Sequence, residues 1–169
     1  MKLVSRWFLA LLIFAAALTT GCGRKEITSL QRKEAASIVS EAQFAVTLRD
    51  YARAEPLLAQ AVALCPDTTQ YWQSLGAVRC RLGNRSGAKD AYGQMLDQAR
   101  DQYKRDATQT EALLQQVYAL ALLGRADDAR GVLVKAQKDH PEDRALGAFV
   151  ESGQLDRILS DPAFKEIAL

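Results

Sequence analysis

The chain has 169 residues, and its 22 Lys and Arg residues nearly balance its 20 Asp and Glu residues, giving a formal net charge of +2. This balance argues against nucleic acid or an anionic lipid surface as the main partner, because both attract clustered positive charge. The single histidine leaves no zinc-protease motif, which requires two histidines.

The first 21 residues are predicted to be a cleaved signal peptide and not part of the fold. Lys2 and Arg6 form a positive start, and the apolar run that follows is too short to span a bilayer comfortably. The run ends in LTTGC at positions 18–22, which resembles a bacterial lipobox. The resemblance implies cleavage before Cys22 and acylation of that cysteine, although Thr19 stands where the lipobox usually has Leu.

Two alternatives for this segment are an ordinary signal peptide with an incidental cysteine and an uncleaved anchor. Under the lipobox hypothesis, residues 22–28 form a lipidated tether, and three acyl chains hold the protein permanently on a membrane. We therefore predict a bacterial envelope protein anchored through Cys22. Gly23 favours the outer membrane, facing the periplasm, because Asp at this place tends to retain lipoproteins in the inner membrane. The 148 residues after cleavage contain 20 basic and 20 acidic residues.

Two helices are predicted to follow the tether. Thr28 and Gln31 fit a capping box, in which each side chain bonds to the other residue's backbone, so a helix is expected from Ser29 to about Leu48. Asp50 is expected to cap a second helix that ends near residue 64.

The central stretch, residues 71–92, is predicted to be a helix, a turn and a second helix. Trp72 and Gly76 share one face of the first helix at i and i+4. Gly83 is expected to end that helix, because glycine readily adopts the left-handed conformation found there. Ser86 is expected to cap the second helix.

The same pattern recurs on both sides of the central stretch. Ile38, Ala54 and Leu58 stand 34 residues before Trp72, Ala88 and Tyr92, and Leu113, Ala129 and Leu133 stand 41 residues after them. The second interval is longer by 7 residues, about two helical turns, so we expect a lengthened helix from residue 86 to about 105. Two capping pairs, Asp67 with Gln70 and Thr108 with Glu111, are expected to begin the first helices of the central and third copies.

The spacing and the residue types resemble the tetratricopeptide repeat, a helix–turn–helix unit of about 34 residues. The positions that match its pattern are Trp72, Leu75, Gly76, Ala88 and Tyr92, whereas Arg79 and Arg100 stand where the family usually has Tyr and Pro. The resemblance implies an all-α fold, namely a right-handed α-solenoid of about three repeats. We place the repeats at residues 35–68, 69–109 and 110–143, in a domain that spans residues 29–143.

Residues 144–169 lose the period and are predicted to form a C-terminal helical cap. Short helices are expected at residues 144–151 and 155–159, and Asp161 is expected to cap a last helix that begins at Pro162. The end repeat of a stack requires such a cover for its apolar face. The alternative is that residues 161–169 are themselves a docking peptide.

No catalytic, cofactor-binding or metal site is predicted, so we expect a protein that is not an enzyme and whose only attached group is the lipid on Cys22. His140 precedes Pro141 in a turn and is expected to be solvated. Cys65 and Cys80 are not expected to form a disulfide, because about 15 Å of helix separates them and a disulfide tolerates about 7 Å between Cα atoms.

The face of each first helix that points away from its partner helix is predicted to bind a polypeptide. In tetratricopeptide proteins this face lines a concave groove, so the resemblance implies these contact residues: Val39, Gln43, Val46, Gln73, Ala77, Arg81, Leu114, Tyr118 and Ala121. Only Arg81, at the edge, is charged, which predicts a neutral or apolar peptide with Tyr118 as its main anchor. Alternatively, the groove holds the chain's own tail, including Phe164 and Ile167, or packs against a neighbouring helix.

Three functions are compatible with these patterns. The leading hypothesis is a membrane-anchored adaptor or scaffold that binds another polypeptide, and the resemblance to bacterial tetratricopeptide lipoproteins implies a role in envelope, secretion or pilus assembly. The other two are a self-associating structural lipoprotein and a non-catalytic regulatory subunit of an envelope enzyme. The sequence indicates neither the partner nor the oligomeric state.

Overall fold

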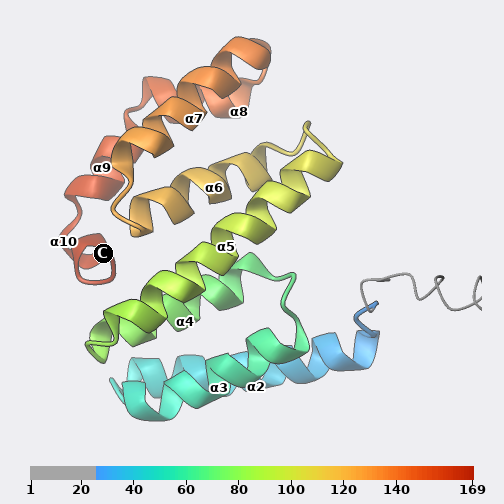
Figure 1. Cartoon of the computed structure of the whole chain (residues 1–169), viewed down its shortest axis with the longest axis vertical. Coiled ribbons are helices and arrows are strands. Elements are labelled where there is room, and N and C mark those ends of the chain that lie inside the picture. Colours follow the sequence, from blue (N-terminus) through green and yellow to red (C-terminus); the bar gives the residue numbers. More distant parts are fainter. Residues whose placement is uncertain (1–25) are drawn as a thin grey trace, which may run out of the picture.

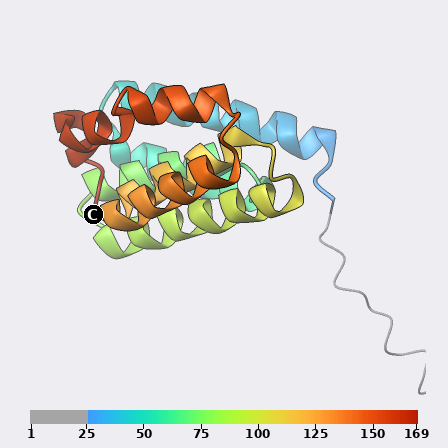
Figure 2. The ribbon, with the colours of Figure 1, turned by 90° about the horizontal axis from the view of Figure 1, so that it is seen from above.

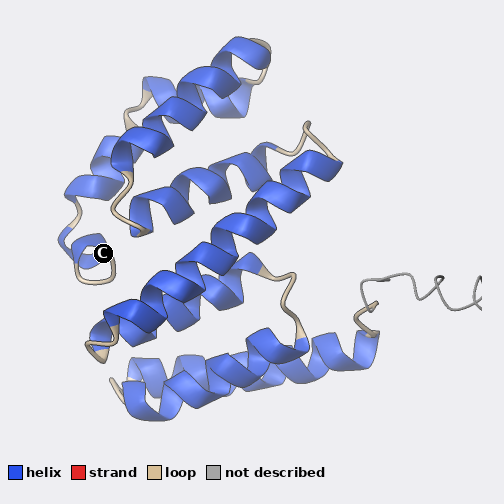
Figure 3. Cartoon of the chain, viewed as in Figure 1, coloured by secondary structure: helices blue, strands red, loops and turns tan. Residues whose placement is uncertain are grey.

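The computed structural model describes residues 26–169, and this range contains nine α-helices and no strand (Figure 3). The expected signal peptide, its cleavage site and Cys22 lie outside the described residues. The all-helical fold class predicted from the sequence is confirmed for the described range.

The helix boundaries agree closely with those expected from capping and periodicity. The helices are α2 (Ser29–Thr47), α3 (Tyr51–Leu64), α4 (Thr69–Arg81), α5 (Arg85–Arg105), α6 (Thr110–Leu122), α7 (Ala126–Asp139), α8 (Arg144–Glu151), α9 (Gln154–Ser160) and α10 (Pro162–Lys165). The longer interval between the second and third copies of the pattern is explained by α5, a single helix of 21 residues.

Each helix packs mainly on its neighbours in the sequence. Figure 1 shows this succession along the long axis of the molecule, from α2 and α3 at one end to α7 and α8 at the other. In the turned view of Figure 2, the C-terminal helices α8 to α10 lie on one side of the stack and α5 lies on the opposite side. The C-terminal helices are therefore placed to form a wall beside the earlier ones.

Several helix starts form as predicted. The capping box of Thr28 and Gln31 begins α2, with both reciprocal hydrogen bonds present. The carboxylate of Asp50 accepts from the backbone N–H of Arg53 at the start of α3. Asp161 caps α10 in the same way, with Pro162 at the first helical position.

Three other capping predictions were wrong. Asn84, not Ser86, caps α5, because the helix begins one residue earlier than expected and the Asn84 side chain accepts from the N–H of Gly87. The two predicted pairs that were to begin α4 and α6 do not cap these helices. Asp67 instead forms an ion pair with Arg32 of α2 at 2.7 Å, and Thr108 bonds to Asp106 within the preceding turn.

A close approach of α4 to α5 occupies the middle of the core. Tyr92 of α5 is fully buried, and its ring lies against Gly76 of α4, where any Cβ atom would overlap the ring. The buried apolar residues form two clusters, one around α2 to α4 and one from α5 to the C-terminal helices, and Trp72 packs against both. Its indole N–H donates to the carbonyl of Pro66 at 2.8 Å. These contacts fix the orientation of α4 relative to α5. The opposite face of α4 is left to line the groove described below.

Candidate binding groove

Helices α2, α4 and α6, each the first of a predicted helix pair, line a groove made of neighbouring cavities. A cavity of about 330 Å³ lies between α2 and α4, and one of about 320 Å³ lies between α4, α6 and the C-terminal helices. Gln73 of α4 lines both cavities, so it marks the point where they meet. A third cavity of about 280 Å³ continues past Arg81 and Tyr118 to the C-terminal tail.

Seven of the nine contact residues predicted from the sequence line these cavities. The cavity between α2 and α4 is lined by Gln43, Val46, Gln73, Ala77 and Arg81, and the cavity beside α6 is lined by Gln73, Leu114 and Tyr118. The structure does not bring Val39 and Ala121 to the groove. Both are buried in the core, with 8% and 1% of their surface exposed, so neither can contact a partner without separation of the packed helices.

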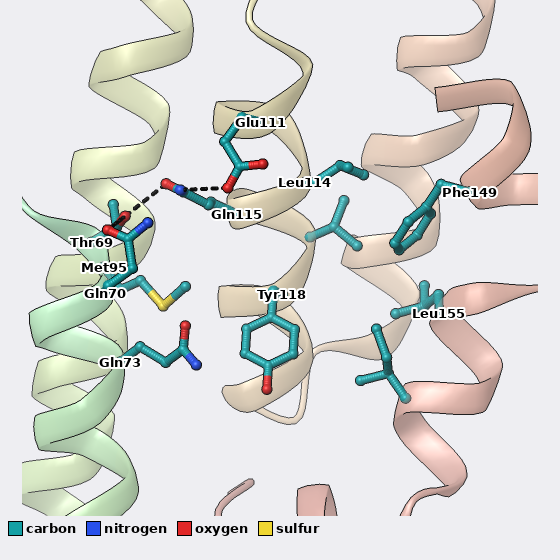
Figure 4. Close-up of a pocket in the computed structure, with 12 residues that line it drawn as sticks. Thr69, Gln70, Gln73, Met95, Glu111, Leu114, Gln115, Tyr118, Phe149 and Leu155 are labelled. Atoms are coloured by element: carbon teal, nitrogen blue, oxygen red, sulfur yellow. Dashed lines mark hydrogen bonds between the residues drawn. The ribbon is translucent and has the colours of Figure 1, made fainter. Parts of the chain in front are cut away.

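The cavity beside α6 has an apolar interior and a polar rim (Figure 4). The hydroxyl of Thr69 donates to the side-chain oxygen of Gln115 at 2.7 Å. The amide nitrogen of Gln115 in turn donates to the carboxylate of Glu111 at 3.0 Å. This chain of hydrogen bonds joins α4 to α6 and fixes the polar edge of the cavity, while the side chain of Gln73 lies below it in Figure 4.

Sequence reasoning missed the far wall of this cavity, which comes from the C-terminal helices. Phe149 of α8 and Leu155 and Ile158 of α9 line it, and Figure 4 shows Phe149 and Leu155 across from Tyr118. Because residues 144–169 do not follow the sequence period, the pattern that predicted the contact residues could not predict these. The spacing of apolar residues three and four apart in α8 and α9 could have indicated a packing role but not this position.

The C-terminal tail occupies one end of the groove. Phe164 of α10 is buried and packs edge-on against Tyr118, with 5.6 Å between the ring centroids. Ile167 lines the cavity shared with Arg81. Burial, with a smaller contribution from Asp161, raises the pKa of Tyr118, so its hydroxyl remains a neutral hydrogen-bond group. Tyr118 is therefore both a groove residue and a support for the tail.

Arg81 brings the single positive charge among the predicted contact residues. It is exposed at the C-terminal end of α4, and its guanidinium lies 5.5 Å from the centre of the Tyr51 ring. This contact with an aromatic face holds the cation at the groove edge. The remaining predicted residues offer amide, aliphatic and aromatic groups, which suit a neutral ligand surface.

The residues singled out earlier for possible chemistry have structural roles. His140 was expected to be solvated, but it is half-buried, and its Nε2 lies 3.0 Å from the hydroxyl of Tyr103. The prediction was wrong because the long helix α5 brings Tyr103 beside the turn after α7. Cys65 and Cys80 are both free thiols, and burial raises the pKa of Cys65.

Residues 26–169 show no group of three or more His, Cys, Asp or Glu side chains arranged to hold a metal ion. No helix in the described range combines the length and apolar character that crossing a bilayer requires. Comparisons with protein-family models, curated proteins and solved structures give no match.

Proposed function

We propose that this protein is a lipid-anchored adaptor built as a right-handed α-solenoid of three tetratricopeptide-like repeats, which binds another polypeptide in the groove of α2, α4 and α6. The proposal draws on the matching positions around Trp72 and Tyr92, on the intervals of 34 and 41 residues, and on the succession of helices that pack on their neighbours. The lipobox-like residues 18–22 supply the anchor.

The observation that carries the proposed binding role is that two cavities adjoin along α4, with Gln73 in the wall of both. Two cavities of similar volume meet at Gln73, and their walls come from several different helices. Ligand sites in proteins are concave, mostly apolar and supplied with a few placed polar groups. An apolar interior with a rim of glutamine and threonine side chains therefore suits a peptide segment, whose backbone amides require hydrogen bonds and whose side chains fill the apolar space.

The ligand is a neutral or apolar segment, either extended or helical. Leu114 and the ring of Tyr118 provide the apolar surface on α6, and Gln73 provides an amide that can both donate and accept. The tail already covers the end of the groove beside Phe164. The free length for a partner therefore runs from the cavity beside α6 towards Val46 of α2.

The proposed function can be tested by photo-crosslinking in intact cells. A benzoylphenylalanine placed at Gln73 lies in the groove, whereas the same group at Gln137 of α7 lies in a cavity on the other side of Phe149 and Leu155. We expect a discrete adduct from Gln73 and none of the same mass from Gln137. Ala77→Arg, which places a long cation in the groove, should abolish the adduct while circular dichroism shows an unchanged helix content.

Equal adducts from both positions would place the binding surface elsewhere. Persistence of the Gln73 adduct in the Ala77→Arg variant would show that the crosslinked protein does not enter the groove. A loss of helix content in that variant would require Gln43→Arg as its replacement, because Gln43 is an exposed groove residue on α2.

A further inference from the structure

The outer face of α2 exposes large apolar side chains that no part of the described structure covers. Among residues 26–169, five large hydrophobic residues are strongly exposed, and three of them are on or directly after α2. Leu30 is 72% exposed, Phe44 60% and Leu48 61%. Such exposure concentrated on one helix marks an interaction surface.

The three side chains lie along one line of the helix. Leu30 and Leu48 are 18 residues apart, which is about five full turns, and Phe44 precedes Leu48 by about one turn. The buried residues Ala35 and Ala42 lie on the opposite side of the helix. The three side chains, here named the α2 stripe (Leu30, Phe44 and Leu48), therefore face away from the core at the two ends of α2, about 27 Å apart, with Ser37 and Glu41 on the same line between them.

Three polar groups beside the α2 stripe are already paired within the protein. The hydroxyl of Ser40 donates to the carbonyl of Ala36, and that of Thr47 to the carbonyl of Gln43, each at 3.0 Å. The carboxylate of Glu41 forms an ion pair with Arg53 at 2.6 Å. Because these groups have partners, removing water from this face leaves fewer polar groups without a hydrogen bond.

Covalent geometry keeps the α2 stripe close to the proposed anchor. Ser29, the first residue of α2, is the seventh residue after Cys22. A chain extends by at most about 3.6 Å per residue, so the start of α2 lies within about 25 Å of an acylated Cys22. The first helix is thus the part of the domain that the tether holds nearest to the bilayer.

We propose that α2 lies on the membrane that holds Cys22, with the α2 stripe inserted between the lipid headgroups. This inference depends on the lipid anchor of the proposed function. Three apolar side chains alone bind a bilayer weakly, but tethering makes the contact intramolecular and raises the effective concentration of the surface. A second copy of the chain fits the stripe less well, because helix packing requires a continuous apolar seam, whereas the polar side chains of Ser37 and Glu41 can stay among the lipid headgroups.

Quenching of tryptophan fluorescence by brominated lipid tests this contact. The acylated mature protein is reconstituted in phosphatidylcholine vesicles with or without bromine on the acyl chains. Phe44→Trp places the reporter on the α2 stripe. Val134→Trp is the matched control, because Val134 is 67% exposed on α7. The parent protein gives the baseline from Trp72.

We expect brominated lipid to reduce the added emission of Phe44→Trp by about twofold and to leave that of Val134→Trp nearly unchanged, because a side chain on a membrane-bound helix face sits at the level of the upper acyl chains. Replacing Leu30 and Leu48 by Ser should restore most of the emission of Phe44→Trp. Equal quenching at the two reporter positions would overturn the inference.

The chemical state of Cys22 separates the possible failures. If mass spectrometry shows acyl chains on Cys22 and Phe44→Trp is not quenched, the inference fails and the anchor stands. If Cys22 carries no acyl chains, the anchor and the inference fail together. If position 44 crosslinks two copies of the chain in the vesicles and the emission of Phe44→Trp is not quenched, the α2 stripe is a self-association surface and the inference is wrong.

Discussion

The hydroxyl of Tyr92 in α5 donates a 2.6 Å hydrogen bond to the backbone carbonyl of Ile167, 75 residues further along the chain. Tyr92 is fully buried, and desolvation is the main cause that raises its pKa, so the hydroxyl keeps its proton and can donate. The N–H of Leu169 donates to the carbonyl of Leu122 at 2.9 Å. The tail is therefore held through its main chain by α5 and by the end of α6.

The bond between Tyr92 and Ile167 predicts a specific coupling in stability. Tyr92→Phe should lower the free energy of unfolding by about 1 kcal/mol, because the carbonyl of Ile167 loses its donor. Removing residues 167–169 should cost more, since it leaves a buried hydroxyl without this acceptor and exposes apolar surface. In the truncated chain, Tyr92→Phe should cost less than in the full chain. Urea unfolding of the four proteins measures this, and an equal cost in both backgrounds would contradict the assigned bond.

Two glycines on neighbouring helices should respond in opposite directions to alanine. Gly76→Ala forces a methyl group into the Tyr92 ring and should destabilise the protein by about 1–3 kcal/mol. Gly93→Ala has open space around the new Cβ and should stabilise α5 by about 0.5–1 kcal/mol. Thermal unfolding of both variants checks this. A neutral effect of Gly76→Ala would mean that α4 and α5 are not in close contact there.

The helix pattern could be read from the sequence where the signal is local or periodic. The capping box at Thr28 and the carboxylate of Asp50 involve residues within one turn, so their bonds follow from spacing alone. The long helix α5 followed from an interval that exceeds the repeat by whole turns. The positions of Gln73 and Tyr118 in the groove followed from the helical periodicity, which places them on the face of α4 and α6 opposite the partner helix.

Contacts between segments far apart in the chain could not be read in this way. The partner of Asp67 is Arg32, 35 residues away, and no local pattern distinguishes this ion pair from a helix cap. Phe149 and Ile158 reach the groove because the C-terminal helices turn back beside α6, which depends on packing without a period. A hydrogen bond to a backbone carbonyl, such as that of Ile167, does not depend on the side chain of the residue, so the sequence gives no signal for it.

The ion pair of Asp67 with Arg32 predicts a pH dependence. The hydrogen bond from Arg32 lowers the pKa of Asp67 below its ordinary value. A carboxyl whose pKa is lower in the folded state contributes stability above its unfolded pKa, near 3.9, and loses it as the pH falls through the folded value. Asp67→Asn should therefore lower the denaturation midpoint at pH 7 and weaken its decrease below about pH 4. The control is Asp97→Asn, because Asp97 is 65% exposed and 4.0 Å from Arg100. An identical pH profile for both variants would contradict the assigned pair.

The anchor is tested at the cysteine that the lipobox resemblance assigns. Cys22→Ser should block incorporation of labelled palmitate and leave the precursor uncut or misplaced in the cell. Cys65→Ser and Cys80→Ser serve as controls, since both thiols are within the helical domain, and they should label like the parent protein. Undiminished labelling of the Cys22→Ser variant would refute the lipobox interpretation.

Binding of the partner segment to purified protein tests the central claim most directly. The segment identified by crosslinking through position 73 is synthesised, and its affinity is measured by calorimetry for the mature chain, Gln73→Arg and Gln137→Arg. Gln73 lines both groove cavities, and Gln137 lies in a cavity on the other side of Phe149 and Leu155, so the two variants differ mainly in location. We predict that Gln73→Arg weakens binding by about tenfold or more, because a cation displaces neutral contacts there, and that Gln137→Arg leaves it unchanged. Equal affinities for all three proteins would contradict a polypeptide-binding groove.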